Sequence, residues 1–140
     1  LNLALEGMSR SKRVGTHYHC GNAGNLGDPA DCAGGDTFFA FEASGGNKTT
    51  TFDQIIYRID PTSGTVIEKS SDGGATFTAL TSPQVVVQKM VFYVTGSSTS
   101  DNSQPKVVLV VSGYAGAKEK TKTNFNIQTV ISQRMLDVSL

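Results

Sequence analysis

The residues best suited to chemistry stand close together near the start of the chain. His17 and His19 flank Tyr18 and directly precede Cys20, and Cys32 follows further on. Alternation along a strand would place both histidines on one face, as chelation of zinc or copper requires. Structural zinc sites use paired C-x₂₋₄-C or H-x₃₋₅-H spacings, however, and neither occurs here. We therefore favour surface or edge-strand histidines beside a disulfide over a metal site, and we expect no cofactor.

The two cysteines, Cys20 and Cys32, enclose a segment rich in Gly, Asn, Asp and Pro that can fold back on itself. A disulfide that closes this loop is the natural expectation, and two reduced thiols are the alternative. On the chain-entropy estimate such a bridge stabilises a domain by roughly 3 kcal/mol. It would also place the domain outside the cytoplasm.

Loop carboxylates are candidate calcium ligands, because calcium needs several converging oxygen atoms. None of the loops has the regular D-x-D-x-D spacing of a calcium loop. The best candidate is the tip formed by Asp101 and Asn102, although a solvated turn is the better interpretation. Further candidates in loops are Asp28, Asp31, Asp60 and Asp72.

Three lysines, Lys118, Lys120 and Lys122, would lie on one side of an extended segment and could contact phosphate. Glu119 interrupts them, and the whole chain carries 12 basic and 12 acidic residues. A dedicated nucleic-acid binder usually has a basic excess on one face. A solvated face is therefore favoured over DNA contact. The loops that carry these lysines and the tip at Asp101 and Asn102 are candidate sites of contact with other surfaces.

No catalytic motif is visible in the sequence. There are two histidines and no G-x-S-x-G, and the glycine pairs at 34–35, 45–46 and 73–74 are not followed by Lys-Ser/Thr as in a phosphate loop. We expect no enzymatic activity and no small-molecule substrate.

The elements that position these residues begin with a predicted helix over 1–14. Leu1, Leu5 and Met8 form an apolar stripe at helical spacing, cations follow in the last turn, and Gly15 ends the helix. The chain opens as though in the middle of this helix, so we expect the helix to continue upstream. No apolar run is long enough to span a bilayer.

From Thr16 onward the apolar period is two, which predicts strands. Turn signals at 60–64 and 72–74 separate neighbours that would pair antiparallel, and a polar tip at 97–104 joins the two longest strands. Arg134, near the end of the last strand, is expected to make a structural ion pair. The predicted strands span 37–43, 52–60, 64–69, 75–80, 84–95, 105–114 and 124–138. Residues 1–140 are thus expected to form one α+β domain, in which the helix 1–14 packs on an antiparallel sheet built from 15–140.

Five stretches carry a resemblance to a known family. They are the helix exit at 6–15 (EGMSRSKRVG), the Tyr57-led hairpin at 57–74 (YRIDPTSGTVIEKSSDGG), the late hairpin at 85–96 and 103–113 (VVVQKMVFYVTG, SQPKVVLVVSG), and the ending at 125–134 (FNIQTVISQR). The chain resembles minor pilins and pseudopilins of type IV pilus, competence and type II secretion systems, and looks most similar to J-type or W-type members.

The resemblance implies a pilin-like fold and a non-enzymatic structural or priming subunit of a surface filament. It implies an apolar anchor upstream of Leu1, which would hold the precursor in the membrane before assembly. The implied partners are other pilin or pseudopilin subunits and the inner-membrane assembly machinery, with Leu1, Leu5 and Met8 on the assembly face. Two alternatives stay open: an adhesin or DNA-capturing module displayed through loops 21–36 and 97–104, and a free-standing secreted β domain.

Overall fold

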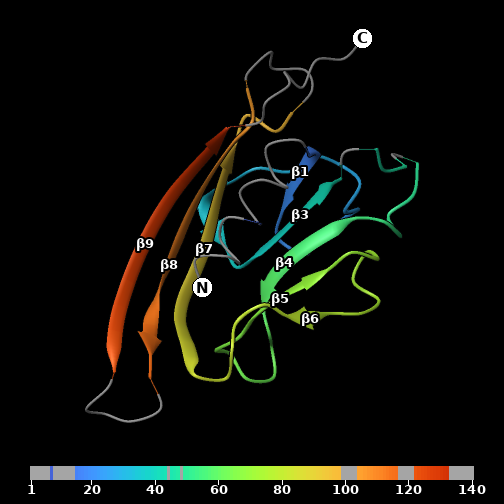
Figure 1. Cartoon of the computed structure of the whole chain (residues 1–140). Coiled ribbons are helices and arrows are strands. Elements are labelled where there is room, and N and C mark those ends of the chain that lie inside the picture. Colours follow the sequence, from blue (N-terminus) through green and yellow to red (C-terminus); the bar gives the residue numbers. More distant parts are fainter. Residues whose placement is uncertain are drawn as a thin grey trace.

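Two antiparallel sheets make up the computed structural model, which describes residues 7, 15–43, 45–47, 49–98, 104–116 and 122–132 (Figure 1). The short-strand sheet has the order β1 (Thr16–Cys20), β3 (Phe38–Glu42), β4 (Ile55–Ile59), β5 (Ile67–Ser70) and β6 (Thr78–Ala79). The long-strand sheet has the order β2 (Cys32–Asp36), β7 (Val85–Thr95), β8 (Lys106–Ala115) and β9 (Thr123–Ser132).

The predicted α+β class is wrong, because the described residues form strands and no helical element. A second sheet covers the apolar face of the short-strand sheet. It removes those apolar side chains from water, as a packed helix would. The helix predicted over 1–14, with Leu1, Leu5 and Met8, lies outside the described residues except for Gly7. Within the described ranges, no helix is long and apolar enough to cross a membrane.

The predicted meander is confirmed in the short-strand sheet, where β3, β4, β5 and β6 pair antiparallel in sequence order. The turn after β4 is built as its residues suggest. The Asp60 carboxylate accepts hydrogen bonds from the backbone N–H groups of Thr62 and Ser63, and Gly64 N–H donates to the Asp60 carbonyl. The bonds from Thr62 and Ser63 favour the ionised form and lower the pKa of Asp60.

The predicted late hairpin is also confirmed. Strands β7 and β8 pair from Val85–Ala115 to Thr95–Lys106, with an irregularity between Val87 and Lys89. Strand β9 then pairs along the whole of β8. The last strand ends at Ser132 within the described residues, so the predicted segment 133–138 and Arg134 lie outside them.

The core lies between the two sheets and is dominated by aromatic rings. Phe39 of the short-strand sheet stacks on Phe92 of the long-strand sheet, with ring centroids 5.2 Å apart and planes 20° apart. Tyr18 meets Phe39 edge to face at 5.3 Å, and Phe41 stacks on Tyr57 at 6.2 Å. All five rings are buried. Aromatic pairs of this kind add stabilisation beyond the area that they bury, so they fix how the sheets face each other.

Burial of Tyr18 predicts a specific response to alkaline pH. Its side chain is fully buried, and this desolvation raises the pKa of the phenol above its ordinary value of 10.0. The stability that this neutral phenol contributes is fully present below pH 10. It is lost as pH rises further, because the unfolded chain then ionises while the folded chain resists. We expect Tyr18→Phe to lose less stability than the wild type between pH 8 and pH 11, measured by urea unfolding.

The matched control for this experiment is Tyr114→Phe, because Tyr114 is only partly buried on β8. This variant should keep the wild-type pH dependence. If the wild type and Tyr18→Phe lost equal free energy of unfolding between pH 8 and pH 11, the buried phenol would not be the cause of the loss.

The segment 71–77 lies against side chains on the outer face of β4, where Gly74 approaches Ile56 and Phe77 lies beside Arg58. Gly73 has φ +73°, and a Cβ there would lie 2.1 Å from the Thr51 carbonyl oxygen, so only glycine fits this close approach. The Arg58 guanidinium lies 3.5 Å from the Phe77 ring centroid, and its Nε donates to Glu68 at 2.6 Å. Strand β4 therefore has contacts on both faces, with the core on one side and with Phe77 on the other.

Candidate functional site

The disulfide predicted from the cysteine pattern is confirmed: Cys20 and Cys32 are bonded, with their Cα atoms 5.7 Å apart. Cys20 ends β1 in the short-strand sheet, whereas Cys32 begins β2 in the long-strand sheet. The bond is thus a covalent tie between the two layers as well as the closure of loop 21–31. A disulfide of this kind is consistent with an extracellular location.

His19 holds the loop 21–31 against β1. Its ring is buried, with Nδ1 2.7 Å from the Asp28 carbonyl oxygen and Nε2 2.9 Å from the Ala23 carbonyl oxygen. Both ring nitrogens thus lie within hydrogen-bond distance of backbone carbonyl oxygens of the loop. The backbone adds Cys20 N–H to Ala30 O at 3.0 Å and Ala30 N–H to Tyr18 O at 2.9 Å. Both ring nitrogens are therefore committed to the loop.

The expectation that His17 and His19 share a strand face is wrong. His17 has φ +56°, a left-handed backbone conformation that is uncommon for residues other than glycine. The pairing with β3 shifts between Thr16 and His19, so His17 occupies a β-bulge. A bulge inserts one residue into the strand and breaks the alternation on which the chelating pair depended.

The two segments that the adhesin alternative would display, 21–36 and 97–104, are in contact through Asp31 and Ser97. The Asp31 carboxylate, at the end of the disulfide-closed loop, accepts hydrogen bonds from the backbone N–H of Ser97 at 2.9 Å and from the Ser97 hydroxyl. Ser97 is buried at the start of the connection between β7 and β8. Loop 21–31 is thus joined to segment 97–98. The rest of the proposed display loop, 32–36, is strand β2, and the tip residues Asp101 and Asn102 lie outside the described residues.

Of the three candidate lysines, the structure describes Lys122 alone. Its ammonium lies 3.8 Å from the Tyr114 ring centroid, a cation–π distance. Lys118 and Lys120 lie outside the described residues, so their proposed alignment with Lys122 stays a prediction.

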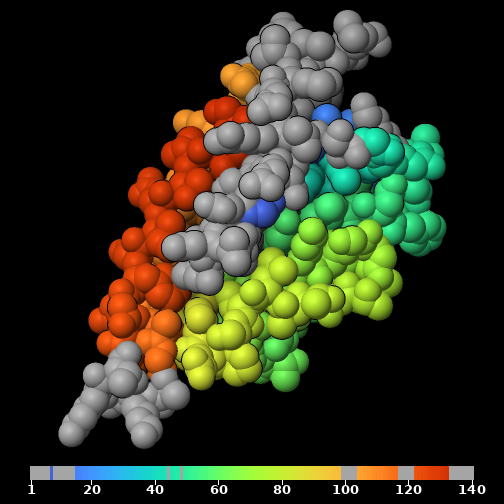
Figure 2. Space-filling model, in the orientation of Figure 1, coloured from blue at the N-terminus to red at the C-terminus, as the bar shows by residue number. Residues whose placement is uncertain are grey.

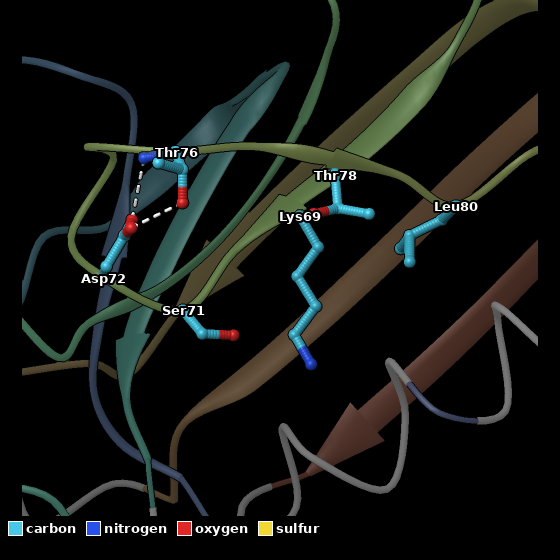
Figure 3. A pocket seen from close by; sticks show the side chains of 6 residues that line it. All are labelled: Lys69, Ser71, Asp72, Thr76, Thr78 and Leu80. Carbon is cyan, nitrogen blue, oxygen red and sulfur yellow. Dashed lines mark hydrogen bonds between the residues drawn. The ribbon is translucent and has the colours of Figure 1, made fainter.

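A pocket of about 320 Å³ lies beside the segment 71–77 and is shown in Figure 3. Asp72 turns toward Thr76 there, whereas the Lys69 side chain points away from that carboxylate (Figure 3). The Asp72 carboxylate accepts from the Ser70 hydroxyl at 2.6 Å and from the Thr76 N–H at 2.9 Å, and also from the Thr76 hydroxyl. These bonds, led by that from Ser70, lower the pKa of Asp72 to about 2. The carboxylate therefore orders the loop.

The lowered pKa makes the order of this loop dependent on acid. Because the folded pKa of Asp72 is depressed, its contribution is present above the ordinary value of 3.8 and is lost as pH falls through about 2. We expect Asp72→Asn to weaken the loop at neutral pH and to abolish its loosening between pH 4 and pH 2. Hydrogen exchange of residues 71–77 across this range is the measurement.

Ser71→Ala is the control for this prediction, because Ser71 is the exposed neighbour of Asp72 on the same pocket. It should leave the acid transition of the loop unchanged. An Asp72→Asn loop that exchanges like the wild type at every pH would contradict the role given to the carboxylate.

A second pocket, of about 430 Å³, lies where the turn 60–64 meets the β7 irregularity at Gln88. Ile59 and Met90 line it together with the polar Asp60 and Lys89. It brings together two segments that are far apart in sequence, and the sequence interpretation missed it. No local signal could have found it, since each half is ordinary turn or strand.

A buried polar pair was also missed. Gln54 Nε2 donates to a Glu42 carboxylate oxygen at 2.6 Å, and both residues are 1% exposed. Glu42 ends β3 and Gln54 precedes β4, so the hairpin pairing brings them together. A buried carboxylate of this kind usually needs charge-assisted hydrogen bonds to remain ionised.

Comparisons of the chain with family models, curated proteins and solved structures find no match. In the part of the chain that the structure describes, no group of three or more His, Cys, Asp or Glu side chains could hold a metal ion. Among the described residues, the disulfide-closed loop and the strand edges are the features from which a binding surface can be argued.

Proposed function

We propose that this chain is a non-enzymatic structural or priming subunit of an extracellular filament of the type IV pilus or pseudopilus class. The supporting observation is that the stretches carrying the resemblance coincide with the hairpin scaffold. The 57–74 stretch contains the end of β4, the turn and the whole of β5, 85–96 and 103–113 contain β7 and most of β8, and 125–132 forms most of β9. These elements would present a rigid body to neighbouring subunits.

The disulfide supports the same proposal, because a subunit exposed outside the cytoplasm gains from a covalent tie between its layers. Its partners would be other pilin or pseudopilin subunits, after release from the inner-membrane assembly machinery. Loop 21–31 and segment 97–98, which are joined through Asp31 and Ser97, would then face outward from the filament.

Deletion of the gene in the producing cell, followed by filament counting in the electron microscope, tests this role. We expect fewer or shorter filaments, restored by the wild-type chain. Unchanged filament number and length with lost attachment or DNA uptake would overturn the structural role in favour of the adhesin or DNA-capturing alternative. An ordinary secretory signal upstream of Leu1, instead of a charged leader and roughly twenty apolar residues, would overturn the filament class.

A further inference from the structure

In the part of the chain that the structure describes, strand β9 is the long edge of its sheet. It spans Thr123–Ser132 and, among the described residues, pairs with β8 alone. Figure 1 shows it as the outermost strand of the long-strand sheet, and Figure 2 shows it along the margin of the molecule. Its sequence, TNFNIQTVIS, contains no charged residue, no proline and no glycine. It therefore lacks the residue types with which proteins usually block addition of a further strand.

The other sheet edges carry such protection. Strand β1 has a bulge at His17, and β6 is two residues long. Strand β2 is five residues long, shifts register against β7 and begins at the disulfide-bonded Cys32. Bulges and short edges disfavour pairing with another chain. Of the four edges that the described strands form, β9 is therefore the best suited to the addition of a strand.

The two faces of β9 define what would fit beside it. Phe125 and Ile127 point to the core side and are only partly buried, whereas Ile131 on the same side is 1% exposed. Asn126 and Gln128 lie exposed on the outer face, as does Val130 at 54%. An added strand must supply apolar side chains on one face and uncharged side chains on the other.

We propose that β9 of a second copy of this chain adds antiparallel at this edge, so that two four-stranded sheets become one continuous sheet of eight. Pairing centred on Ile127 places that residue opposite the partner subunit's Ile127. It also places Asn126 opposite the partner subunit's Gln128, so like faces meet and no charge opposes a like charge. The arrangement is twofold and closed, and it gives a dimer. It does not rest on the filament proposal, since it needs only this edge.

The experiment is sedimentation of the whole chain over a concentration series, with two charge variants. Asn126→Lys/Gln128→Lys and Asn126→Glu/Gln128→Glu place like charges opposite each other in the proposed pairing. Each variant alone should sediment at the 14.8 kDa monomer mass, the wild type at twice that mass, and a mixture of the two variants as a heterodimer. The control is Gln88→Lys/Thr95→Lys, which adds the same charge at exposed positions of the interior strand β7 and should leave the dimer intact.

Circular dichroism of each variant establishes that it is folded before its mass is interpreted. A wild-type chain that stays monomeric up to its solubility limit would overturn the proposal. So would a dimer that persists in both charge variants, or an open-ended series of larger species. Concentration-dependent protection of residues 123–132 from hydrogen exchange, absent in the lysine variant, would support it.

Discussion

Phe92→Ala is expected to lower the free energy of unfolding by about 3–5 kcal/mol, the usual cost of truncating a buried phenylalanine. Phe92 is fully buried and stacks on Phe39 from the opposite sheet at 5.2 Å. The truncation would leave a cavity between two layers whose backbones are held by their own ladders and by the disulfide, so collapse around it is restricted. Equilibrium urea unfolding at neutral pH measures the effect.

The matched control is Phe52→Ala, because Phe52 is 81% exposed in the connection between β3 and β4. Its expected effect is within about 0.5 kcal/mol. The double variant Phe39→Ala/Phe92→Ala should lose less free energy of unfolding than the two single variants together. Each single variant already removes the stacking between the two rings, so the sum counts that stacking twice. Similar losses for Phe92→Ala and Phe52→Ala, or additive losses at 39 and 92, would contradict stacking between the sheets.

The second large effect is expected for Cys20→Ser/Cys32→Ser, which should lower the free energy of unfolding by about 3 kcal/mol. The bond closes loop 21–31 and ties β1 to β2. Without it, the pairing of β2 with its sheet is the irregular one with β7, whose register shifts between Cys32 and Asp36. Strand β2 should therefore exchange its amide hydrogens much faster, while β8 and β9 stay protected.

Reduction of the wild-type disulfide is the control for this variant, and the reduced chain should match the double serine variant in unfolding and exchange. The His19 and Asp31 hydrogen bonds remain in both, so residues 28–31 should keep part of their protection. A uniform loss of protection from hydrogen exchange across both sheets would contradict a local role of the disulfide at β2. It would indicate that the bond stabilises the whole fold.

The strands of the meander and of the late hairpin could be predicted because their signals are local. The valine-rich runs of β7 and β8 and the Asp60 turn each depend on residues within a few positions of one another. The cysteine pairing could be predicted for the same reason, since a short flexible segment separates the two residues. Strand β2 (CAGGD) was missed, because two glycines give no strand pattern and the segment is extended only through its pairing with β7.

By itself, therefore, the sequence determined the β-rich composition, the hairpins joined by short turns and the disulfide. The tertiary structure alone decided the layer that covers the short-strand sheet, the bulge that separates His17 from the face of His19, and the carbonyl partners of the His19 ring. It also decided the contact of Glu42 with Gln54 and the position of β9 at the edge of its sheet. Each of these depends on contacts between segments far apart in the chain, whose free energies no local pattern of side chains encodes.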